Sequence, residues 1–93
     1  MKYKINNNEK LIEYNGQNIH LTKKEFDLFV YFQSNPNKVM TREELLEKVW
    51  EYGVIVDTRT IDVHIRRLRG KFPDIPIVTR KCYGYMWKSD VLQ

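Results

Sequence analysis

Residues 59–71 are predicted to form a helix with one apolar face and one basic face. At 3.6 residues per turn, one side of this helix collects only large apolar side chains: Ile61, Ile65, Leu68 and, just beyond, Phe72. The opposite side carries Arg59, Val63, Arg66 and Arg67, with Thr60, His64 and Lys71 beside them. A helix that is held to a core by one face and presents arginines on the other can lie in a DNA major groove. A solvated basic helix on an ordinary surface is the alternative.

The positive charge of the chain is concentrated in its last third. Residues 1–58 contain eight Lys and Arg against nine Asp and Glu, a net charge of −1. Residues 59–88 contain eight Lys and Arg against two Asp, a net charge of +6. Such segregation indicates a face that binds a polyanion. Nucleic acid fits better than an anionic membrane, because the basic helix lacks an exposed face of large apolar residues.

The composition is that of one soluble globular domain, with 42% hydrophobic and 30% charged residues among 93. No segment approaches the roughly 18 apolar residues of a membrane span. The polar segment Met1–Lys10 does not resemble a signal peptide. The only cysteine, Cys82, excludes an intramolecular disulfide and fits a reducing cytoplasm. We expect no metal site, no cofactor and no enzymatic activity, because neither metal-ligand spacing nor a catalytic constellation is visible.

The elements that position the basic helix can be predicted from their turn and cap residues. Three short strands are expected at the start of the chain: Tyr3–Asn6, Lys10–Tyr14 and Gln17–Leu21. Asn15 and Gly16 form a strong two-residue hairpin signal between the last two strands. Helices over 23–34 and 42–50 each begin with a predicted capping box, Thr22 with Glu25 and Thr41 with Glu44.

The basic helix and a second hairpin complete the predicted order. Asp57 or Thr58 can cap the helix at its start, and Pro73 and Pro76 prevent its continuation. Alternating residues then predict strands over Ile77–Arg80 and Gly84–Lys88, joined by a basic tip at 81–83. The order predicts an α+β fold: a winged helix-turn-helix with an N-terminal antiparallel sheet, three helices and a C-terminal hairpin wing at 77–88.

Four motifs in this order resemble those of one protein family. They are Leu21–Phe26 at the first helix start, Thr41–Trp50 in the second helix, Arg59–Arg69 in the basic helix, and Gly84-Tyr85 at the end of the wing. Together they resemble the DNA-binding effector (C-terminal) domain of OmpR/PhoB-type two-component response regulators. The resemblance extends over essentially the whole chain, residues 1–93, which we interpret as one domain.

The resemblance implies a bacterial transcription regulator whose receiver domain is phosphorylated by a sensor histidine kinase. We expect this chain to be the C-terminal domain without that receiver domain, a natural single-domain regulator being the alternative. The isolated domain is expected to be a cytoplasmic monomer that binds double-stranded DNA as two protomers on tandem half-sites, about one helical turn apart.

The helical wheel and the resemblance together predict the residues that contact DNA: Thr41, Arg42, Trp50, Arg59, Thr60, Val63, His64, Arg66, Arg67, Arg69, Lys71, Thr79, Arg80, Lys81 and Tyr85. Several have structural alternatives. Arg69 could pair with Glu44 or Glu47, while Trp50 and His64 could serve only in packing. Asp62 is expected to pair with Arg66, four residues later.

Two segments need separate interpretation. At the wing tip, Cys82 stands where the resembling family usually has glycine, and Lys81 replaces a usual arginine, which suits a narrow minor groove less well. We interpret Cys82 as an incidental small side chain, a reactive thiol being the alternative. The loop holding Tyr52, Gly53, Val54 and Ile55 corresponds to the segment that contacts RNA polymerase in activators, although packing on the domain core explains its apolar content equally well.

The sequence therefore predicts sequence-specific double-stranded DNA binding for transcription regulation, with helix 59–71 in the major groove and the wing beside it. A winged helix that binds another protein is the main alternative, and a double-stranded RNA or shape-only binder is the second.

Overall fold

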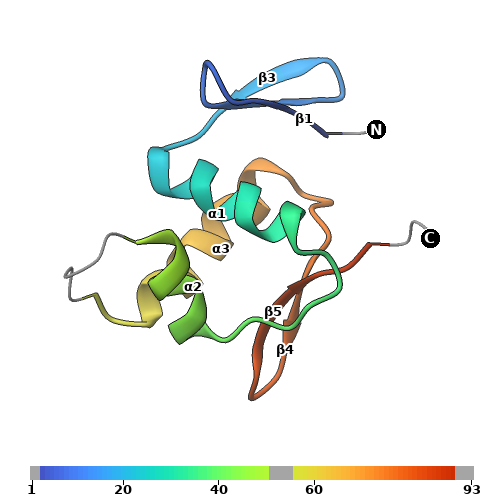
Figure 1. The fold of residues 1–93 in the computed structure, drawn as a ribbon. Coiled ribbons are helices and arrows are strands. Elements are labelled where there is room, and N and C mark those ends of the chain that lie inside the picture. The colour runs from blue at the N-terminus through green and yellow to red at the C-terminus, as the bar shows by residue number, and fades with distance from the viewer. Residues whose placement is uncertain (1–2, 51–55, 90–93) are drawn as a thin grey trace.

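The computed structural model describes residues 3–50 and 56–89. Its elements follow the predicted order (Figure 1): β1 (Tyr3–Asn6), β2 (Leu11–Tyr14), β3 (Gln17–His20), α1 (Lys23–Ser34), α2 (Arg42–Val49), α3 (Arg59–Lys71), β4 (Ile77–Arg80) and β5 (Gly84–Trp87). The N-terminal sheet and the β4–β5 wing lie at opposite ends of the helical layer (Figure 1). None of the helices in the described ranges is both long and apolar enough to cross a membrane.

The N-terminal sheet is an antiparallel meander in the order β1-β2-β3. Asn15 and Gly16 both have positive φ angles, 50° and 84°, as the predicted tight turn requires. Lys10 has a φ of 56° and belongs to the preceding turn, so β2 begins one residue later than predicted. Leu21 likewise lies outside β3, because the chain there turns into the cap of α1.

The two predicted capping boxes differ in the structure. In the first, the Thr22 hydroxyl accepts from the Glu25 amide at 3.3 Å, and the Glu25 carboxylate accepts from the Thr22 amide at 3.0 Å. In the second, the Thr41 hydroxyl accepts from the Glu44 amide at 3.0 Å. The Glu44 carboxylate turns instead to Lys38, at 3.3 Å, so only half of the second box forms.

Helix α3 has the predicted bounds and the predicted buried stripe. The Asp57 carboxylate accepts from the Arg59 amide at 2.8 Å, whereas the Thr58 side chain makes no cap hydrogen bond. Ile61, Ile65 and Leu68 are at most 1% exposed. Because α3 packs on α1 and α2 through this stripe, its other face is turned away from the core.

An aromatic cluster joins the two ends of the molecule. The ring of Tyr3 packs against Phe29, Phe72 and Trp87, with centroids 5.5–5.9 Å apart. Tyr3 and Tyr14 also stack on each other, and both hydroxyls donate to Asp74. The N-terminal sheet is therefore part of the same core as α1, the end of α3 and the wing.

The wing is bound to the helix-turn-helix through its second strand. β4 and β5 pair in an antiparallel register, Thr79 opposite Tyr85. Met40, just before α2, exchanges two backbone hydrogen bonds with Tyr85, of 2.8 and 3.0 Å. The α+β winged helix with an N-terminal sheet is confirmed, although α2 ends at Val49, with Trp50 as its C-cap.

Candidate nucleic-acid interface

The outward face of α3 carries cations that no carboxylate neutralises in the part of the chain that the structure describes. Arg66 and Arg67 are exposed, and neither has a hydrogen-bond or ion-pair partner among residues 3–50 and 56–89. Val63, one turn earlier, is 43% exposed. The only carboxylate on α3, that of Asp62, is held by other residues. This face therefore combines a local positive charge with one apolar side chain.

The wing tip adds two more cations. Arg80 and Lys81 are exposed, and within the described part of the chain their side chains are unpaired. The tip is a turn closed by a hydrogen bond from the Tyr83 amide to the Arg80 carbonyl at 2.9 Å. Tyr83 is 69% exposed and was not among the predicted site residues. Its position between two strands of a basic hairpin is the signal that could have identified it.

Two predicted DNA-binding cations are bound to carboxylates. Arg59 pairs with Asp57 at 2.9 Å, and both side chains are exposed. Lys71 donates to Glu25 at 2.6 Å and to the His20 carbonyl at 3.2 Å. The Glu25 side chain is only 2% exposed. Burial acts to raise the pKa of Glu25, but the hydrogen bonds from Lys71 and Thr22 outweigh it and hold the pKa below its ordinary value. The structure gives Lys71 the role of neutralising a buried carboxylate.

Arg69 binds the wing. One Nη atom of its guanidinium donates to the Ile77 carbonyl and to the Thr79 hydroxyl, both at 3.0 Å. The alternative of an ion pair with Glu44 or Glu47 is therefore wrong. The partners lie on β4, which passes beside α3, and Thr79 is thereby engaged as well.

Asp62 does not pair with Arg66 as expected. Its carboxylate accepts from the Nε of Arg42 at 2.8 Å and from the hydroxyl of Tyr85. Tyr85 is 5% exposed and Arg42 half-buried, so both lie behind the outward face of α3. The i, i+4 rule failed here because a carboxylate at a crowded helix junction has stronger partners than a flexible, exposed arginine.

His64 and Trp50 meet on the flank of α3. Their rings pack edge to face, 5.0 Å apart, and both side chains are half-buried. The His64 Nδ1 lies 2.8 Å from the Thr60 carbonyl. A carbonyl can only accept, so Nδ1 carries the proton that it donates to Thr60. Nε2 is then the ring nitrogen that remains available for a hydrogen bond to another group.

Comparison with known proteins identifies the family. The model of the family described as "Transcriptional regulatory protein, C terminal" matches residues 16–87, from the turn after β2 to the end of β5. The chain belongs to this family.

A sequence relative and two solved structures illustrate the similarity. The transcriptional regulatory protein VxrB of Vibrio cholerae is 45% identical over 76 residues, which cover 82% of this chain and 31% of VxrB. DrrB of Thermotoga maritima, an OmpR/PhoB homolog, is 36% identical with a TM-score of 0.82 over 96% of this chain and 42% of DrrB. The RstA DNA-binding domain of Klebsiella pneumoniae, solved with the RstA box, is 27% identical with a TM-score of 0.80, covering 95% and 92%.

These matches place the chain among the C-terminal effector domains of OmpR/PhoB-type response regulators, which are DNA-binding domains of transcription regulators. The chain spans less than a third of the length of VxrB. The segment predicted to contact RNA polymerase lies outside the described residues: Tyr52, Gly53, Val54 and Ile55.

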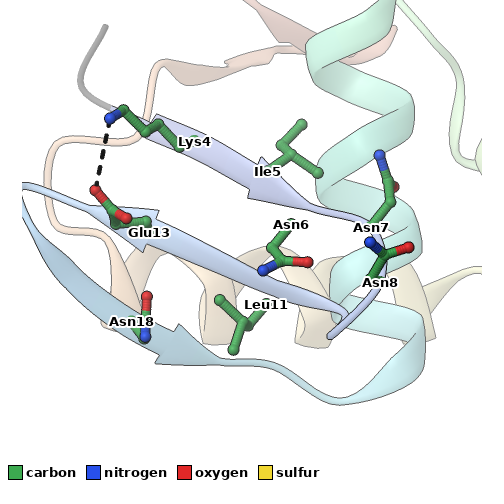
Figure 2. A pocket seen from close by; sticks show the side chains of 8 residues that line it. All are labelled: Lys4, Ile5, Asn6, Asn7, Asn8, Leu11, Glu13 and Asn18. Atoms are coloured by element: carbon green, nitrogen blue, oxygen red, sulfur yellow. Dashed lines mark ion pairs between the residues drawn. The ribbon is translucent and has the colours of Figure 1, made fainter.

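The effector domain also has a pocket of about 440 Å³ on its N-terminal sheet (Figure 2). An ion pair between Lys4 and Glu13, 4.0 Å apart, crosses its rim. The residues that line the pocket are Lys4, Ile5, Asn6, Asn7, Asn8, Leu11, Glu13 and Asn18. None of them belongs to the predicted DNA-binding set. In the described ranges, no group of three or more His, Cys, Asp or Glu side chains is arranged to hold a metal ion.

Proposed function

We propose that this effector domain binds double-stranded DNA sequence-specifically, with α3 in the major groove and the wing beside it. The observation that carries the proposal is the set of unpaired, exposed cations on α3 and the wing tip: Arg66, Arg67, Arg80 and Lys81. Most cations of the N-terminal half instead have a carboxylate or an aromatic ring as partner. Membership of a DNA-binding family and the RstA–DNA complex support the same reading.

The dimensions and chemistry of α3 suit the groove. Thirteen residues give a helix of about 20 Å, and the major groove, about 12 Å wide, admits it. We assign base contacts to Arg67 and Arg66, whose guanidinium groups can donate two hydrogen bonds to guanine. Val63 is placed to meet a thymine methyl group. Contacts from Arg80 and Lys81 at the wing tip are assigned to the DNA backbone.

The flank of α3 supplies weaker candidates. Thr41 is exposed at the start of α2, where free amides favour a phosphate. Trp50, Thr60 and His64 are half-buried at the edge of the same surface. We assign these four residues to phosphate contacts. We also assign a DNA contact to Arg59, which can make it only when its ion pair with Asp57 breaks.

The same proposal extends to the assembly in which the domain works. We infer that two protomers occupy tandem half-sites in the cytoplasm. A receiver domain, phosphorylated by a histidine kinase, controls their binding. Residues 52–55 contact RNA polymerase. Binding is the whole of the proposed activity, with no reaction catalysed and no cofactor.

The experiment that tests the proposal compares Arg67→Ala with Lys48→Ala. Lys48 is an exposed lysine of α2 beside the turn after β1 and the outer face of α1, away from the α3 face. Arg67→Ala should weaken binding to a preferred duplex by about 1–3 kcal/mol and relax its sequence preference. Lys48→Ala should leave both unchanged.

Two results would redirect the assignment. Equal effects of both variants on specific and random duplexes would leave only non-specific attraction to a polyanion. Absence of duplex binding by the wild-type domain at low salt would favour the protein–protein module.

A further inference from the structure

Tyr85 stands where the wing, α2 and α3 meet. Its hydroxyl donates to Oδ1 of Asp62 on α3, and the same oxygen accepts from Nε of Arg42 on α2 at 2.8 Å. Tyr85 is 5% exposed, so its hydroxyl reaches Asp62 from the core side, while the side chains of Arg42 and Asp62 are 36% and 40% exposed. One carboxylate oxygen therefore links three elements that the proposed function brings to one duplex.

The ring of Tyr85 extends the network to the first strand of the wing. The guanidinium carbons of Arg42 and Arg69 lie 5.4 and 5.8 Å from its centroid. Arg69 in turn donates to the Ile77 carbonyl and the Thr79 hydroxyl. Both strands of the wing are thus attached to α3 by polar contacts.

The protonation states match these roles. Burial acts to raise the pKa of Asp62, but the hydrogen bonds from Tyr85 and Arg42 outweigh it and hold the pKa below its ordinary value. Burial, and then the bond to Asp62, raise the pKa of Tyr85. At neutral pH the carboxylate is charged and the phenol keeps the proton that it donates.

We propose that Arg42, Asp62 and Tyr85 form a positioning cluster that fixes the wing relative to α3. The inference deepens the proposed function, on which its consequence for DNA rests: the cluster lets Lys81 at the wing tip and Arg67 on α3 meet one duplex at the same time. Arg42 and Tyr85, predicted as DNA contacts, then act through other residues. The Tyr85 hydroxyl is the link, because the ring packs in the core with or without it.

The position of the wing can be measured without DNA. Cys82 is the only cysteine and is exposed at the wing tip, so a spin label there and another at Val63→Cys report the distance from the tip to α3. We expect one narrow distance distribution, broadened by Tyr85→Phe and by Asp62→Asn. Tyr31→Phe is the matched control, because it removes a hydroxyl that donates to Glu44 at 3.4 Å, a contact between α1 and α2 that includes no residue of the wing.

The consequence for DNA can be measured by a double-mutant cycle. In the wild-type background, Lys81→Ala should weaken binding about fivefold. In the Tyr85→Phe background it should weaken binding by less than about twofold, because the wing no longer meets the backbone. The effect of Arg67→Ala should be the same in both backgrounds. A merely structural role for Tyr85 would change all affinities equally.

Distance distributions as narrow in Tyr85→Phe as in the wild type would overturn the cluster as a positioning device. An unchanged effect of Lys81→Ala in the cycle would overturn its role in DNA binding. If the wild-type domain binds no duplex, the proposed function fails, and the distances alone still decide whether the cluster fixes the wing.

Discussion

A Cβ atom on Gly84 would lie 2.1 Å from the carbonyl oxygen of Met40. Gly84 also has a φ of 149°, which L side chains rarely adopt. This close approach is what lets β5 run against the segment before α2, where Met40 and Tyr85 exchange two backbone hydrogen bonds. Because Gly84 has no side chain, the wing can approach the helix-turn-helix closely enough for these hydrogen bonds to form.

Gly84→Ala should destabilise the domain by about 2–4 kcal/mol, because both the clash with Met40 and the backbone conformation must relax. Gly70→Ala is the matched control: Gly70 lies exposed in α3, and a Cβ there would have nothing within 4 Å. It should stabilise the domain by about 0.5–1 kcal/mol. Urea unfolding measures both changes. Similar effects at the two glycines would show that the contact with Met40 has no special importance.

Cys82→Gly should stabilise the domain. Cys82 has a φ of 70° at the third position of the turn that joins the wing strands, where a positive φ favours glycine. The gain should be about 1 kcal/mol, since relief of strain exceeds the added entropy of the unfolded chain. Lys81→Gly, one residue earlier at a negative φ, should instead lose about 0.5–1 kcal/mol in the same unfolding experiment. A loss at both positions would contradict the strain at Cys82.

Lys71→Met should destabilise the domain by about 2 kcal/mol, because it leaves the buried carboxylate of Glu25 without its cation. The Lys71 side chain is 37% exposed, so solvent screening keeps the loss below that of breaking a fully buried pair. Adding Glu25→Gln to this variant should recover part of the loss. Specific DNA affinity, measured where the variant is folded, should stay close to that of the wild type. A selective loss of affinity without a loss of stability would return Lys71 to the DNA interface.

Acid should weaken the domain through the same pair. The folded-state pKa of Glu25 lies below its ordinary value of 4.5, so the stabilisation is complete above about pH 4.5 and is lost as the pH falls through the lowered pKa. The wild type should therefore exceed Glu25→Gln in unfolding free energy at neutral pH, and the difference should shrink below pH 4.5. Asp62, whose pKa is also lowered, contributes in the same direction in both proteins. A difference that does not change with pH would contradict this assignment.

Local signals were enough to predict the elements. The bounds of α1 and α3 follow from Thr22, from Asp57 and from the prolines beyond each helix end, all of which act on neighbouring residues. The apolar stripe of α3 followed from periodicity alone, and its burial is confirmed. Motifs of this kind also identified the family, because they specify a helix start or a recognition face within a few residues.

The partners of the charged side chains could not be predicted in the same way. Lys71 meets Glu25 across 46 positions of the chain, Asp62 meets Arg42 across 20, and Arg69 reaches β4. A helical wheel shows the direction in which such a side chain leaves the helix, not the element that covers it. The pairing predicted between Asp62 and Arg66 is wrong for the same reason, whereas the outward direction that the helical wheel gave Arg66 and Arg67 agrees with their exposure.

The central claim is that the exposed face of α3 reads base sequence, and selection of bound duplexes from a random DNA pool tests it most directly. We predict enrichment of two direct half-sites whose centres are about one helical turn apart. The enriched positions should lose preference when Arg67 is replaced by alanine. Retention of duplexes at low salt without any enriched sequence would contradict the claim.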